Sequence, residues 1–100
     1  MAKADVIYLI TEQESAHGVH APVERTERMV YCQIRSVTRS EFYTALNAGI
    51  QPEYVFVLAV AEEYQDERHV RYRDQIFDVV RTYVTEEDGI ELTVRRSDDR

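Results

Sequence analysis

The sequence has little of what enzymes, metal proteins or exported proteins usually contain. It has a single cysteine, Cys32, so it cannot form an intramolecular disulfide or a cysteine-rich metal site. An apolar run at residues 6–10 is far too short for a signal peptide core or a membrane span. There is no phosphate-binding loop, no Gly-x-Ser-x-Gly motif and no His-Glu-x-x-His motif. We therefore expect a protein that is not an enzyme, needs no cofactor and stays in the cytoplasm of the cell that makes it.

Basic residues are also scarce relative to acidic ones. The chain has 12 lysines and arginines against 19 aspartates and glutamates, which gives a net charge of −7. Non-specific nucleic-acid binding depends on cationic side chains that displace the counterions of the phosphates. A chain with this charge is not expected to bind nucleic acid in general.

The hydrophobic pattern predicts a folded, mainly β protein. Hydrophobic residues make up 44% of the 100 residues, which suits a single domain over residues 1–100 with its own core. Most apolar segments alternate with a period of two, and turn residues separate them. The sequence therefore predicts a small antiparallel β-barrel or sandwich of about six strands, with one short inserted α-helix.

Two predicted strands, at residues 6–10 and 53–61, are apolar on both faces. A small barrel has only one interior, so these strands have more apolar surface than the barrel can bury. The chain also has seven tyrosines and no tryptophan. Tyrosine suits half-buried strand faces and protein interfaces. The surplus of apolar strand surface favours contacts with other subunits.

Polar segments predict the connections. Residues 12–25 are expected to form a long loop, and residues 95–100 a frayed C-terminal tail. Acidic residues cluster in two predicted turns, at 62–67 and 86–88, where carboxylates are usually solvated. Asp88 followed by Gly89 predicts a type I′ turn, because both residues tolerate a positive φ.

Candidate metal ligands and nucleophiles do not form a recognisable site. His17 and His20 lie in the predicted loop without the further ligands that a structural metal site needs. His69 is expected at the surface. Cys32 shares a strand face with Val30, which predicts a buried thiol rather than a nucleophile. We expect no metal site.

Residues 34–56 contain the most specific pattern in the chain. Thr38 precedes a predicted helix at about residues 39–48, and Glu41 has the spacing of a capping box. Pro52 prevents the helix from continuing. One face of this helix is apolar and is expected to dock on another surface. That face contains Phe42, Ala45, Leu46 and Gly49.

This segment resembles the head–tail joining proteins of long-tailed bacteriophages, which are also called head-closure or adaptor proteins. The similarity lies in the Arg-Ser-Val-Thr-Arg-Ser-Glu-Phe-Tyr run at 35–43 and the Gly-x-x-Pro-Glu-Tyr pattern at 49–54. Residues 5–10, 72–83 and 90–94 resemble the first strand, the central hairpin and the last strand of that family. In the central hairpin, Asp74-Gln75 replaces a turn that usually contains glycine. Most of the chain is covered by these structural signatures.

The resemblance implies a virion structural protein in the neck of a tailed phage, made in the cytoplasm of the host bacterium. Copies would form a ring that closes the DNA-filled head below the portal and provides the attachment site for the tail. The implied partners are other copies of the chain, portal or adaptor proteins, and tail-side proteins. Packaged DNA would pass nearby without sequence-specific binding, which an acidic surface permits. No membrane contact is expected.

The resemblance also places the segment at 38–51 toward the channel or a neighbouring subunit. We expect this segment to be mobile or differently packed in the isolated subunit and to become fixed on assembly. The loop at 12–25 is a second candidate contact. Arg71 and Arg73 pair with acidic residues of a neighbouring copy or are solvated at their own sheet edge, and the sequence favours neither alternative. The candidate contact residues are Thr38, Arg39, Glu41, Phe42, Tyr43, Leu46, Tyr54, Arg71 and Arg73.

Two other functions are compatible with the sequence. A tail-side ring protein similar to tail terminators would share the same gene neighbourhood, and only docking to tail tubes rather than to portal–adaptor complexes would distinguish it. A monomeric small β-barrel that binds a ligand or a peptide would share only the architecture, because a fold alone does not determine function.

Overall fold

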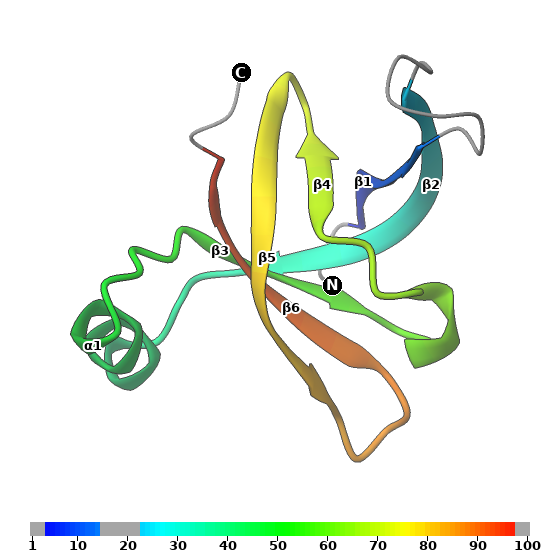
Figure 1. The fold of residues 1–100 in the computed structure, drawn as a ribbon. Coiled ribbons are helices and arrows are strands. Elements are labelled where there is room, and N and C mark those ends of the chain that lie inside the picture. The colour runs from blue at the N-terminus through cyan, green and yellow to red at the C-terminus, as the bar shows by residue number, and fades with distance from the viewer. Residues whose placement is uncertain (1–3, 15–22, 98–100) are drawn as a thin grey trace.

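Six antiparallel strands close into a barrel in the computed structural model, which describes residues 4–14 and 23–97 (Figure 1). This architecture confirms the predicted small antiparallel barrel with one inserted α-helix. The helix α1 (Arg39–Asn47) lies between the second and third strands, and a 3-10 helix η1 (Ala61–Glu63) follows the third. The strands are β1 (Asp5–Glu14), β2 (Val23–Arg35), β3 (Tyr54–Leu58), β4 (His69–Tyr72), β5 (Gln75–Val84) and β6 (Ile90–Arg96).

The strand order around the barrel is β1-β2-β3-β6-β5-β4. Pairing between β1 and β4 closes the barrel, and it is confined to Tyr8, Leu9 and Ile10 on β1. The pairing between β1 and β2 is much longer and continues over the whole of β1. The far part of the β1–β2 ribbon therefore extends beyond β4 (Figure 1).

Alternate residues of the strands fill the barrel interior, as the period of two predicts. Ile7 and Leu9 of β1 are fully buried, and Leu92 and Val94 of β6 are buried beside them in the same core. Aromatic rings occupy part of this interior, with centroids 5.5–6.1 Å apart and mostly edge-to-face or tilted. These rings belong to Tyr54, Phe56, Tyr72 and Phe77.

The outer face of β3 is covered by the chain itself. Val55 lies opposite Arg35 and Thr93, on the other face of β3 from the core residue Phe56, yet it is fully buried. Thr93 lines a groove together with residues of the α1 segment, which places that segment over this face. Part of the apolar surface that the sequence assigns to subunit contacts is therefore buried within one subunit.

Two predicted connections differ from the structure. The loop predicted at residues 12–25 is wrong at both ends, because β1 continues to Glu14 and β2 begins at Val23. Polar residues pair across this ribbon, so apolar alternation does not mark it. The predicted frayed tail is wrong for Arg95 and Arg96, which belong to β6. His17, His20 and residues 98–100 lie outside the described residues.

The turn between β5 and β6 is not the predicted type I′ turn. Asp88 has a positive φ of 65°, whereas Gly89 does not have a positive φ. The Asp88 N–H donates to the Thr85 carbonyl (3.1 Å), and the Thr85 N–H donates to the Gly89 carbonyl (2.9 Å). This pattern is a three-residue loop whose last residue is left-handed. Asp88 therefore takes the left-handed conformation of this turn, and Gly89 is not needed for it.

Candidate interaction site

The α1 segment is attached to the barrel by one arginine at the end of β2. Arg35 donates from Nη1 and Nη2 to the two carboxylate oxygens of Glu41, at 3.0 and 3.1 Å. Its Nη2 also donates to Glu91 Oε1 of β6 at 2.9 Å. The bidentate contact fixes orientation as well as distance. Arg35 thus connects β2, the first turn of α1 and β6.

Glu41 also completes the capping box that the sequence predicts. The Glu41 N–H donates to Thr38 Oγ1 at 3.2 Å, and the Thr38 N–H donates to Glu41 Oε1 at 2.9 Å. The hydrogen bond from Arg35 and the hydrogen bonds that the Thr38 N–H and hydroxyl donate to the carboxylate lower the pKa of Glu41 to about 2. The hydrogen bond to Glu41 raises the pKa of the Arg35 guanidinium in turn. Both groups are charged at neutral pH, so the cap and the ion pair reinforce each other.

The helix ends as predicted but does not dock as predicted. Gly49 has a φ of 78°, the left-handed conformation that ends many helices. None of the residues of α1 is buried, although its apolar residues were expected to dock. Tyr43 is 58% exposed and Leu46 is 45% exposed. Phe42 is half-buried and packs edge-to-face against Tyr43, with ring centroids 6.0 Å apart. Two large apolar side chains of α1, Tyr43 and Leu46, are therefore exposed to water.

A shallow apolar groove runs between α1 and the outer surface of β5 and β6. Its volume is about 190 Å³, which is smaller than typical ligand pockets of about 300–1,000 Å³. Ala45 and Ala48 form the helix side of the groove, and Val80 forms part of the strand side. The remaining lining residues are Glu41, Thr44, Ile50, Arg81 and Thr93.

The other predicted contact residues are in different surroundings. Arg71 donates from Nε and Nη2 to Glu27 of its own chain, at 2.9 and 2.8 Å, and lies over the Tyr8 ring. Arg71 therefore pairs with an acidic residue of its own subunit, which is neither of the two alternatives drawn from the sequence. Arg73 is exposed, with its guanidinium over the ring of Tyr72. Arg39 is exposed at the start of α1, and Tyr54 packs against the aromatic residues of the core.

Glu67 is a buried carboxylate in a segment whose acidic sequence predicts a solvated turn. The side chain of Glu67 is only 3% exposed, although the acidic turn at 62–67 was expected to be solvated. Its Oε2 lies 2.6 Å from Arg28 Nη2, and its Oε1 accepts the Gln65 N–H at 2.7 Å. Asp66, next to it in the chain, has a positive φ of 62°. The pair ties the segment before β4 to β2.

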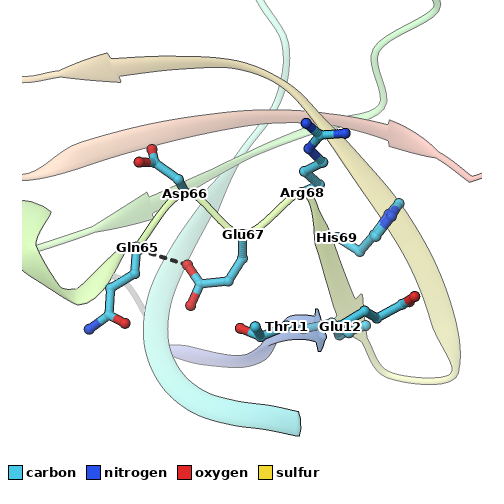
Figure 2. A pocket seen from close by; sticks show the side chains of 8 residues that line it. Thr11, Glu12, Gln65, Asp66, Glu67, Arg68 and His69 are labelled. Atoms are coloured by element: carbon cyan, nitrogen blue, oxygen red, sulfur yellow. Dashed lines mark hydrogen bonds between the residues drawn. The ribbon is translucent and has the colours of Figure 1, made fainter. Parts of the chain in front are cut away.

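Glu67 lies beside a hollow of about 380 Å³ between the end of β1 and the segment before β4. Figure 2 shows Thr11 and Glu12 on one side of this hollow, with Asp66 and Arg68 turned to the other side of the segment from Glu67. Ile10 is the one aliphatic lining residue. Ligand pockets are mostly apolar, so this polar hollow is a weak candidate for binding a small molecule.

His69 is also less exposed than expected. Its Nδ1 lies 3.0 Å from Asp78 Oδ1 across the β4–β5 pair, and both side chains are half-buried. Asp78 also pairs with Arg95 Nε at 3.5 Å. These contacts connect three neighbouring strands and engage both carboxylate oxygens of Asp78.

Within residues 4–14 and 23–97, no group of three or more His, Cys, Asp or Glu side chains is placed to hold a metal ion. Nor does any helix in this part of the chain have the length and apolar character needed to cross a membrane. No protein-family model matches the chain, and no curated protein matches it.

Proposed function

We propose that the chain is a ring-forming structural protein at the head–tail junction of a tailed bacteriophage. In this function, copies assemble below the portal, close the filled head and provide the surface to which the tail attaches. The resemblance of residues 34–56 to head–tail joining proteins supports the proposal from the sequence. The arrangement of α1 supports it from the structure.

The observation that carries the proposal is an α-helix that is firmly capped and anchored but buries none of its residues. A nine-residue helix is too short to persist alone in water. Arg35 and the capping box hold it on the barrel. The apolar side chains of Tyr43 and Leu46 nevertheless remain exposed, at a cost in solubility that a partner surface would offset.

A monomeric ligand-binding barrel is the competing function. Such barrels need a cavity, and the interior of this barrel contains buried side chains, including the large rings of Phe56 and Phe77. The apolar groove beside α1 is small, and the larger hollow beside Glu67 is lined by polar and charged residues apart from Ile10. These features favour a protein that acts through its outer surface.

The proposal is tested by truncating the exposed face of α1. Tyr43→Ala and Leu46→Ala should leave the free energy of unfolding within about 0.5 kcal/mol of wild type, because both residues are exposed and neither belongs to the buried core. Each should raise the protein concentration needed for ring assembly by about tenfold, which corresponds to a loss of roughly 1.4 kcal/mol of contact energy. Asn47→Ala, at an exposed polar position of the same helix, is the matched control.

Assembly is measured by sedimentation and electron microscopy, and tail joining by complementation of a phage that lacks the protein. If both alanine variants form rings and join tails like wild type, α1 is not the contact. If wild type joins no tails in the phage that encodes it, the function itself is wrong.

A further inference from the structure

The second half of β5 has one edge without a partner strand. β4 pairs with β5 only as far as Asp78, and the Val79 N–H still donates to the Arg68 carbonyl at 2.8 Å. Beyond that point β5 pairs with β6 alone. In Figure 1 the far half of the β5–β6 ribbon extends away from β4. Its last four residues are all exposed, and they are Arg81, Thr82, Tyr83 and Val84.

The hydrogen-bonding groups of this edge point outward. The Thr85 N–H donates to the Gly89 carbonyl, so these two residues form a hydrogen-bonded pair. Hydrogen-bonded and non-hydrogen-bonded pairs alternate along an antiparallel ladder. Thr82 and Val84 therefore direct their N–H and C=O groups away from β6, and these groups have no protein partner in the described residues. A β-branched edge of this kind is a template for an added strand.

The same chain has a second unpaired edge on β2. This strand runs from Val23 to Arg35, but β3 pairs with it only at Gln33, Ile34 and Arg35. Over the preceding residues β2 pairs with β1 alone among the strands. Met29 and Tyr31 project from the outer face beside this edge, and they are 48% and 63% exposed.

We infer that β5 of one copy adds to β2 of the next copy as an antiparallel strand, an inference that rests on the proposed ring. The two edges belong to different surfaces of one molecule, so each copy offers one and accepts the other. Such a head-to-tail contact produces a ring when its rotation closes. Backbone hydrogen bonds would hold the strands together, and the facing side chains would set the register.

Side-chain complementarity selects the register. When Tyr83 is placed opposite Met29 in an antiparallel pair, Arg81 lies opposite Tyr31 on the same outer face. These are an aromatic–thioether pair and a cation–aromatic pair. The same register brings the acidic turn after β5 toward the exposed Arg25. This register thus gives two favourable side-chain pairs on the outer face and brings opposite charges together at the turn.

Cysteine cross-linking tests this register with Tyr83→Cys and Met29→Cys, both at exposed positions. A mixture of the two single variants should give covalent dimers under mild oxidation, and the double variant should give a ladder up to the full ring. Each single variant alone should give no cross-link, because the wild-type Cys32 is buried. Cross-linking of Tyr83→Cys with itself would show a symmetric contact and would overturn the inference.

A proline substitution tests the contact without cross-linking. Val84→Pro removes an N–H that points outward, so the subunit should keep its thermal unfolding temperature while assembly requires at least tenfold more protein. Val84→Thr keeps the N–H and should assemble like wild type. If wild type forms rings, but Val84→Pro assembles as readily as wild type and the cysteine pair does not cross-link, this contact is overturned and the proposed function stands. A wild-type chain that stays monomeric with its phage partners present would overturn both.

Discussion

At the turn between β5 and β6, two adjacent residues have different roles. Asp88 takes the left-handed conformation, and Gly89 brings the turn close to the end of β3. A Cβ atom on Gly89 would lie 2.6 Å from the Leu58 carbonyl oxygen, which is too close for any side chain. The glycine is thus needed for close packing of two strands.

We predict that Gly89→Ala destabilises the protein by about 1–3 kcal/mol, because the backbone of β3 must move. Gly49→Ala is the matched comparison. At Gly49 nothing lies within 4 Å of an added Cβ, so only the positive φ is unfavourable, at roughly 1 kcal/mol. Urea unfolding of both variants measures the difference. A Gly89→Ala variant as stable as wild type would contradict the close approach.

Cys32 should be unreactive in the folded protein. Burial, aided by the Asp5 carboxylate, raises the pKa of its thiol to about 12. The thiolate is the reactive form, so an aromatic disulfide reagent at about pH 8 should label Cys32 only after unfolding. Rapid labelling of the native protein would show that β1 and β2 separate easily. Because this native thiol is buried, only the cysteines introduced at positions 29 and 83 should form cross-links.

Residues differ in how far the sequence alone predicts them. The burial of Cys32 follows from its place on an alternating strand face, which is a local property. The burial of Glu67 could not be predicted, because it depends on Arg28, which is 39 positions away in the chain. A turn carboxylate looks solvated until the strand that pairs with it is known.

Among the elements, α1 was predicted closely because its signals are local. The capping residues lie within four positions of each other, and the helix begins and ends within one residue of the expected bounds. Its anchoring to Glu91 through Arg35 depends on the register of β2, β3 and β6, which the sequence does not reveal. The β1–β2 ribbon was underestimated for the same reason, since its outer part pairs polar residues.

The cap of α1 should depend on pH through Glu41. Its folded-state pKa of about 2 lies below the ordinary 4.5, so the ionised side chain stabilises the folded state above about pH 4.5. This contribution is lost as the pH falls from about 4.5 to about 2. Glu41→Gln should therefore cost about 1–2 kcal/mol at neutral pH, since the carboxylate is partly exposed, and much less at about pH 2.

Urea unfolding of wild type and Glu41→Gln at several pH values measures this difference. Comparing the two proteins at each pH removes the contribution of the other carboxylates. A difference that is equal at neutral and acidic pH would show that the charge of Glu41 does not support the helix.

At the scale of the whole molecule, the barrel buries more of its apolar surface than the sequence suggests. Val55 faces outward but is covered, and Ile10 is also fully buried. Among residues 4–14 and 23–97, most of the exposed large hydrophobic residues lie on three elements. They are Met29 and Tyr31 on β2, Tyr43 and Leu46 on α1, and Tyr83 and Val84 on β5, with Val60 after β3.

Electron microscopy tests the proposed ring assembly most directly, with the purified chain alone and mixed with the portal–adaptor complex of the phage that we propose encodes it. We expect annular particles of one diameter that dock on the portal complex, because the exposed residues of β2, α1 and β5 are then covered by neighbouring copies. Single subunits at every concentration, with no ring even on the portal complex, would contradict the claim.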